Sequence, residues 1–320
     1  MAKGISLHIG VNRLDPASYQ LAPTNQGWQC VVVNDEGEVT RFPGNFNVAW
    51  EGPLTSCEKD AEDMQALARR QKFSTKILRT QQATAKSVET AIRKAAKKLK
   101  SGDTFLLSYA GHGSQVEDLT GDEWDGTDET WCLYDRMFLD DEQRALYAEF
   151  DKGVNIVVLS DSCHSGTATR SVNAEDHALK QHRGQRSMSE RTAMAVYEGN
   201  KKMYDKIQRA LPNPPPKLKA SRILLAACQD HEHAHGDDEN GVFTRALLKV
   251  WSSGAFEGSY SDLARAIRQE LQAQYETAMD KAEGDASASA VKLQVPNFVR
   301  IKGTSKKALS KLSKQKAFSI

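Results

Sequence analysis

The stretch "GVNIVVLSDSCHSG" (residues 153–166) joins a run of apolar, mostly β-branched residues to a cluster of polar and reactive ones. The apolar part predicts a strand that is buried on both faces of a sheet. In open α/β sheets, ligands bind just beyond the carboxyl ends of the parallel strands. Cys163 follows this strand directly. The stretch therefore predicts a parallel sheet and puts Cys163 at the edge where chemistry takes place.

A second stretch, "DTFLLSYAGHG" (103–113), has the same form and ends in glycines around His112. Neighbouring strand ends bring such side chains close together, and a nucleophilic cysteine needs a nearby imidazole. The backbone amides of Gly113 and Cys163 could stabilise the oxyanion of an acyl-transfer intermediate. The alternative is that Cys163 is a small buried core residue and His112 a hydrogen-bonded loop residue.

Strand-like and helix-like segments alternate along most of the chain. Such alternation predicts right-handed crossovers and a doubly wound, mostly parallel sheet flanked by helices on both faces. We expect strands over 5–12, 75–80, 103–113, 153–160, 222–230 and 295–301, a hairpin over 29–42, and helices over 56–73, 84–102, 140–150, 191–210, 242–251 and 259–279.

Composition limits the function classes. The 320 residues carry a formal net charge of +1, which argues against a chain built to bind nucleic acid or an acidic membrane. The first residues lack the apolar core of a signal peptide, and no apolar stretch is long enough to span a membrane. Five widely spaced cysteines argue against a disulfide framework and predict a cytoplasmic protein.

Two motifs, "YAGHGSQ" and "SDSCHSGT", lie about fifty residues apart, which resembles the spacing in caspase-like cysteine peptidases of clan CD, peptidase family C14. The D-x-C-H-S-G setting is similar to that of the metacaspase and bacterial orthocaspase branch. The resemblance extends through "HIGVN", "CEKDAEDM", "DGTDETWCLYD" and "LAACQD…NGVFTRALL". It implies a caspase-like fold, a catalytic dyad of His112 and Cys163, and endopeptidase activity on protein substrates.

The resemblance also implies a substrate preference. Asp60 and Asp161 match the two acids that form the family's S1 pocket. A pair of carboxylates recognises a cation, and the guanidinium fork of arginine suits it better than the lysine ammonium. We therefore expect protein substrates with exposed Arg or Lys sites. Asp60 has an alternative interpretation as an acid that favours the helix dipole in a first turn.

A cluster of acids in "DLTGDEWDGTDETWCLYD" includes Asp125 and Asp128, whose oxygens could hold Ca²⁺ or simply face solvent. The family resemblance would put calcium ligands near Asp140 and Asp141. The further acid of the family, seven residues past the nucleophile, is Arg170 in this chain. We therefore expect no required cofactor and keep calcium as the alternative.

Another motif, "HEHAH" (231–235), formally matches the H-E-x-x-H zinc signature, with Glu232 as general base. That signature belongs on a helix, whereas this motif follows a predicted strand. The sequence therefore favours a cysteine peptidase over a zinc peptidase. A third alternative is a caspase-like scaffold without catalytic activity.

The expected organisation is one peptidase domain over residues 1–303, followed by a basic, solvated tail over 304–320. Residues 1–170 are similar to the large subunit of the family and 221–303 to the small one. Between them lies a basic, Pro-containing linker, residues 171–220.

The segment that follows the nucleophile is polar and rich in basic residues, so a protease that cuts after Arg or Lys would meet it first. We expect it to cover the active site until it is cut, by the protein itself or by an upstream protease, with a regulatory partner as a further possibility. The alternative is a tolerated insertion without a regulatory role. The candidate autoprocessing residues are Arg170, Lys180, Arg183, Arg186, Arg191, Lys201 and Lys202.

Overall fold

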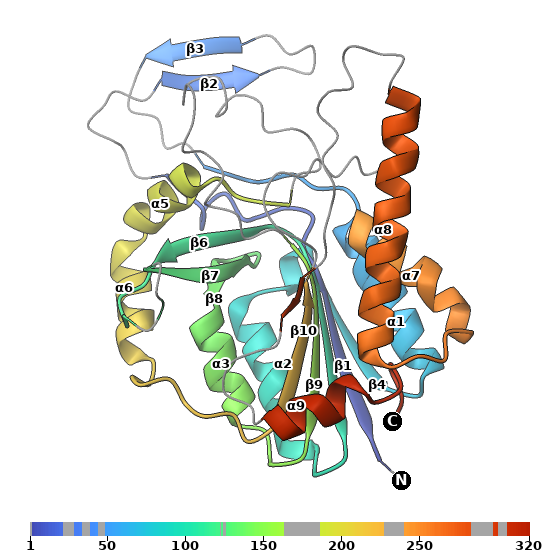
Figure 1. The fold of residues 1–320 in the computed structure, drawn as a ribbon. Helices are drawn as coiled ribbons and strands as arrows, with labels where there is room; N and C mark the ends of the chain where they lie inside the picture. Colours follow the sequence, from blue (N-terminus) through green and yellow to red (C-terminus); the bar gives the residue numbers. More distant parts are fainter. Residues whose placement is uncertain are drawn as a thin grey trace.

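In a computed structural model of the chain, a central sheet has helices on both faces (Figure 1). The structure describes residues 2–21, 29–33, 39–43, 49–121, 123, 126–162, 186–226, 240–282, 297–299 and 306–320. The predicted fold class, a mostly parallel α/β sheet covered on both sides, is confirmed.

The strands of the central sheet follow the order β11-β10-β9-β5-β1-β4. All neighbours in it are parallel except β11, which pairs antiparallel with β10 at one edge. The strands are β1 (Gly4–Gly10), β4 (Ser74–Arg79), β5 (Thr104–Ala110), β9 (Asn155–Asp161), β10 (Ser221–Ala226) and β11 (Asn297–Val299).

Side chains of the central strands alternate between two cores. Leu107 and Val158 belong to the core under one layer of helices, and Leu106 and Val157 to the core under the other. A strand buried on both faces needs such continuous apolar sequence. The first layer holds α2 (Ala85–Lys98) and α3 (Asp140–Ala148), and the second holds α1 (Cys57–Arg70), α7 (Val242–Trp251) and α8 (Tyr260–Ala282) (Figure 1).

Smaller sheets and short turns lie outside the central sheet. The predicted hairpin is confirmed as β2 (Gln29–Val33) paired with β3 (Val39–Pro43). A three-stranded antiparallel sheet consists of β6 (Gly113–Glu117), β7 (Thr127–Cys132) and β8 (Met137–Leu139). The acidic stretch after β6 is therefore not all loop, because residues 127–130 belong to β7. Short 3-10 turns are η1 (Thr80–Gln82) and η2 (Ser252–Gly254).

The helix expected over 191–210 is confirmed, but parts of the linker around it are buried although its composition is polar. Residues 190–210 form two helices, α5 (Glu190–Gly199) and α6 (Lys201–Ala210), and α5 contacts β6. Met188 and Tyr204 are buried in the main core. Apolar residues spaced among many charges anchor this segment, although its average composition is polar.

The prediction of a solvated tail is also wrong for residues 306–320. They form α9 (Lys306–Ser313), which contacts β10, and then a turn that returns to the core. Phe318 is fully buried with its ring edge-on to Trp251 and Tyr260. Within the described residues, every helix is too short or too polar to cross a membrane.

Candidate active site

The imidazole of His112 lies just past the end of β5, and its hydrogen bonds define its tautomer. Nε2 is 2.9 Å from the carbonyl oxygen of Gly52. A carbonyl only accepts, so Nε2 carries the hydrogen and the Nδ1 of the neutral ring keeps its lone pair. Nδ1 is buried and has no hydrogen-bond partner among the described residues. The imidazole is thus arranged to accept a proton at Nδ1.

Burial controls the charge of this imidazole. It lowers the pKa of His112 to about 4; the Gly52 carbonyl opposes the shift and the positive charge of Arg186 adds to it. His112 is therefore neutral at physiological pH in this arrangement. A neutral imidazole is the form that acts as a general base.

Several residues that sequence reasoning missed hold His112 in place. Gly52 has a φ of +49°, and a Cβ atom there would lie 2.8 Å from Nε2 of His112. The hydroxyl of Tyr109 donates to the carbonyl oxygen of His112 at 2.7 Å. The Trp50 ring lies beside the imidazole, with ring centroids 4.7 Å apart. The only sequence signal for this contribution was the stretch "WEGP" (50–53) before the first helix.

The register of the sheet brings the two predicted strand ends together. Ala110 of β5 pairs with Asp161 of β9, and the N–H of Gly111 donates to the carbonyl oxygen of Asp161 at 3.4 Å. Ser162, which follows, is buried. Cys163 itself lies outside the described residues, as the next position along the chain after that edge.

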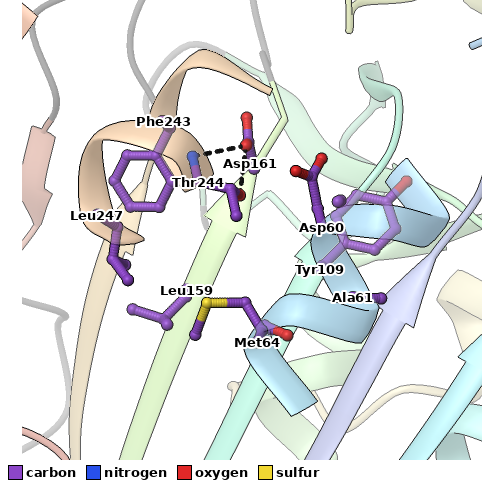
Figure 2. Close-up of a pocket in the computed structure, with 11 residues that line it drawn as sticks. Asp60, Ala61, Met64, Tyr109, Leu159, Asp161, Phe243, Thr244 and Leu247 are labelled. Atoms are coloured by element: carbon purple, nitrogen blue, oxygen red, sulfur yellow. Dashed lines mark hydrogen bonds between the residues drawn. The ribbon is translucent and has the colours of Figure 1, made fainter. Parts of the chain in front are cut away.

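Asp60 and Asp161 meet across one pocket, although they are a hundred residues apart (Figure 2). Asp60 comes from the first turn of α1 and Asp161 from the end of β9, and both are buried. Apolar side chains line the rest of the pocket, among them Met64, Leu159 and Leu247. Asp60 is therefore more than an acid favoured by the helix dipole.

Arg186 inserts its side chain between the two acids, and only 4% of it is exposed. Its Nη1 lies 2.9 Å from Oδ2 of Asp161 and 3.1 Å from that residue's carbonyl oxygen. Its Nη2 pairs with Oδ2 of Asp60 and donates to Oγ of Ser56 at 2.9 Å. Ser56 lies at the N-cap position of α1, but its hydroxyl makes no cap bond to the helix and contacts Arg186 instead.

The charges of this cluster depend on one another. Burial raises the pKa of Asp60, and the adjacent Arg186 opposes that shift. Burial alone would lower the pKa of Arg186, but the neighbouring Asp161 and Asp60 outweigh it and raise that pKa well above its ordinary value. Arg186 is therefore charged, and its cation offsets the repulsion between two buried carboxylates.

The backbone of Arg186 is held as firmly as its side chain. Its carbonyl oxygen accepts a hydrogen bond from the N–H of Gly113 at 3.0 Å. Ser187 bridges to Gly113 in parallel fashion, and the N–H of Met188 donates to the carbonyl oxygen of Gly113 at 2.9 Å. One amide of the predicted oxyanion pair thus contacts the carbonyl of the residue that fills the acid pocket.

The other autoprocessing candidates are not in that position. Arg191 is exposed in the first turn of α5, and Lys201 and Lys202 lie in the first turn of α6. The remaining three lie outside the described residues: Arg170, Lys180 and Arg183.

Within the described part of the chain, the candidate calcium ligands do not form a complete site. Burial raises the pKa of Asp140 to about 8, and the nearby carboxylates of Glu129 and Asp141 add to the shift. Asp128 is buried on β7, whereas Asp125 lies outside the described residues. Among the described residues, no three His, Cys, Asp or Glu side chains are arranged to hold a metal ion. The zinc-like motif at residues 231–235 also lies outside them.

Comparison with known families agrees with the fold. The sequence profile of the caspase domain, Peptidase_C14, matches residues 39–307. The chain therefore belongs to the caspase domain family, a family of cysteine peptidases.

The individual relatives include metacaspases from a fungus and a plant. Metacaspase-1 of Schizosaccharomyces pombe is 29% identical over 223 residues, covering 60% of this chain and 52% of that protein. Metacaspase-7 of Arabidopsis thaliana is 40% identical over 87 residues, covering 27% of this chain and 22% of that protein. The chain thus spans about half the length of the first of these relatives, and less of the second.

Solved structures support the same fold. The crystal structure of protein GSU0716 from Geobacter sulfurreducens is 36% identical, with a TM-score of 0.73 and 99% coverage of both chains. Caspase-1 from Spodoptera frugiperda has a TM-score of 0.51 at 10% identity, covering 93% of this chain and 86% of that one. The likeness to caspase-1 concerns the fold alone.

Proposed function

We propose that this chain is a cysteine endopeptidase that cleaves after arginine or lysine, with His112 and Cys163 as its catalytic dyad. The observation that carries the proposal is the position of Arg186. Its guanidinium ends between two buried carboxylates while its carbonyl oxygen accepts a hydrogen bond from Gly113. A substrate with a basic residue at the cleavage point would bind in the same way.

The tautomer of His112 supports a definite order of proton transfers. Nδ1 accepts the proton of the Cys163 thiol, and the thiolate attacks the carbonyl carbon of the bound basic residue. The carbonyl oxygen becomes an oxyanion, which the N–H groups of Gly113 and Cys163 stabilise. The imidazolium then protonates the departing amine as the C–N bond breaks. Water hydrolyses the thioester and restores the dyad.

This sequence of steps uses a thiol, an imidazole and backbone amides of the chain itself. We therefore propose that hydrolysis requires no metal ion. Calcium remains the alternative, since the family resemblance assigns ligands near Asp140 and Asp141.

We further propose that the protein controls itself by cleaving the Arg186–Ser187 bond. The backbone on both sides of this bond lies along Gly113, as a bound substrate would. The peptide groups that follow Lys201 and Lys202 lie inside a helix, where a protease cannot bind them in extended form. Until Arg186 leaves, the acid pocket is closed to other substrates.

A chain that never releases Arg186 would be a scaffold without catalytic activity, and the buried position of this side chain suits that alternative too. Incubation of the wild-type chain with peptides that contain Arg, Lys or Asp at one position separates the two functions. We expect hydrolysis after Arg and Lys only, and none with Cys163→Ala. A wild-type chain that cleaves no peptide, with or without added Ca²⁺, would favour the scaffold.

A further inference from the structure

The start of α7 and the two residues before it, Asn240 and Gly241, form one wall of the acid pocket. Asn240 donates from Nδ2 to Oδ1 of Asp60 at 2.9 Å, and the N–H of Gly241 donates to the same oxygen at 2.9 Å. These two bonds engage Oδ1 and leave Oδ2 of Asp60 to pair with Nη2 of Arg186. The start of α7 thus orients one of the two carboxylates.

The same turn also orients the second carboxylate. Oδ2 of Asp161 accepts from the N–H of Thr244 at 3.1 Å and from its Oγ1 at 2.7 Å (Figure 2). Backbone N–H groups at the start of a helix have no partner within the helix, so they are free to bind acids. The spacing between the acids is therefore set by α7 rather than by α1 and β9 alone.

Gly241 lies against the flat face of the bound guanidinium. A Cβ atom at this position would lie 2.5 Å from Cζ, 2.5 Å from Nη2 and 2.7 Å from Nη1 of Arg186. Nearly equal distances to three atoms of one plane mean that the contact is with the face of the group. The backbone of Gly241, with φ −61° and ψ 154°, suits any residue. A side chain at position 241 would therefore be opposed by the bound guanidinium and not by the backbone conformation.

The hydrogen-bond acceptors around the Arg186 side chain match a guanidinium, which has two terminal nitrogens that donate separately. Nη1 has two acceptors on Asp161, and Nη2 has one on Asp60 and one on Ser56. A lysine ammonium concentrates its donors on one nitrogen, so it cannot reach both pairs at once.

We propose that Gly241 is a specificity-determining residue that makes this pocket select arginine over lysine. Its missing side chain leaves a slot as thin as a guanidinium, with fixed carboxylates on either side. The inference rests on the proposed peptidase function and refines its substrate class.

The test compares Arg186→Ala with Arg186→Ala/Gly241→Ala, because both chains have a vacant pocket. Two peptides that differ only by Arg or Lys at the cleavage point serve as substrates. For the single variant, we expect kcat/KM to be at least about tenfold higher with the Arg peptide than with the Lys peptide. The added methyl should lower kcat/KM for Arg at least about tenfold and for Lys much less, because it overlaps the guanidinium. Val242→Ala, in the same turn, is the matched control and should leave the ratio unchanged.

Self-cleavage gives a second readout within the intact chain. The wild type should cut itself faster than Arg186→Lys. When Gly241→Ala is added to both chains, this difference in rate should disappear or reverse. Fragment masses measured over time give the rates. Equal losses for Arg and Lys in both readouts would overturn the role of Gly241 while the peptidase function stands. Failure of every Cys163-containing chain to cleave either peptide or itself would instead overturn the proposed function, and this inference with it.

Discussion

The backbone N–H of Gly113 donates to the carbonyl oxygen of Arg186 over 3.0 Å, while the Arg186 side chain pairs with both pocket acids. A single residue therefore fills the acid pocket and accepts a hydrogen bond from the amide next to His112. In acyl-transfer enzymes, backbone N–H groups near the reacting carbonyl stabilise the oxyanion that develops on its oxygen. Under the proposed function, the chain holds one of its own peptide bonds as it would hold a substrate.

The first prediction concerns Arg186. In the wild type, incubation should produce a new N-terminus at Ser187, and peptide hydrolysis should accelerate as this cut accumulates. Arg186→Ala should lack the cut and should cleave added peptides without a lag, because its pocket is open from the start. Fragment masses and progress curves measure both effects.

The matched control is Arg191→Ala, which removes an exposed basic residue five positions away. It should cut and accelerate like the wild type. Persistence of the lag in Arg186→Ala, with the cut at another site, would show that Arg186 does not control the pocket.

The second prediction concerns the acid pair. Asp60→Asn and Asp161→Asn should each lower kcat/KM for basic peptides by at least about tenfold, since a lost charge-assisted contact is worth roughly 1.5–3 kcal/mol. In the uncut, Cys163→Ala background each change should also destabilise the fold by about 3–5 kcal/mol, because Arg186 stays buried with one partner fewer. Denaturant unfolding measures this loss.

Adding Arg186→Ala to either acid variant should recover much of the stability, since the uncompensated cation is then gone. Glu62→Gln, on the exposed side of α1, is the control and should change neither activity nor stability appreciably. Additive losses in the double variants would mean that Arg186 and the acids do not interact in solution.

The third prediction concerns Gly52. Gly52→Ala should lower kcat about a hundredfold with little change in KM, because the new methyl displaces the His112 imidazole and leaves the acid pocket intact. Gly102→Ala is the matched control: its φ is +94°, yet a Cβ there would meet nothing within 4 Å. It bears the same kind of backbone strain and should retain kcat, so equal losses in both variants would point to general destabilisation.

The fourth prediction is a pKa. In uncut Cys163→Ala, His112 should titrate near 4, as followed by the NMR shifts of its ring protons and assigned with His112→Gln. Removing the Arg186 cation in Cys163→Ala/Arg186→Ala should raise this pKa, because a nearby positive charge disfavours the imidazolium. An unchanged titration would show that Arg186 does not lie near His112 in solution.

The fifth prediction concerns metals. EDTA should leave peptide hydrolysis largely intact, and so should His231→Ala, because the proposed steps use only the dyad and backbone amides. Loss of activity that only Zn²⁺ restores would favour the zinc interpretation. Loss that Ca²⁺ restores, and that Asp140→Asn makes permanent, would support the calcium alternative.

Much of the fold follows from the sequence alone. Runs such as 104–110 and 155–161 are apolar on both faces, and only strands inside a covered sheet can bury them. Amphipathic spacing predicts the intervening helices, and α7 begins and ends where that spacing indicates. The prediction of His112 and Cys163 as a dyad uses the same local reasoning, because each lies at or just after the end of a predicted strand.

Tertiary structure decided which distant residues meet. Arg186 is one of seven basic candidates in the sequence, and only packing brings it to Asp60, 126 residues away. The Gly52 carbonyl reaches His112 across 60 residues, and Ser56 contacts Arg186 instead of capping its own helix. Phe318 joins the core because Trp251 and Tyr260 offer an apolar surface there. Local periodicity depends on neighbours in sequence, whereas these contacts depend on how separate elements pack, so sequence patterns alone do not specify them.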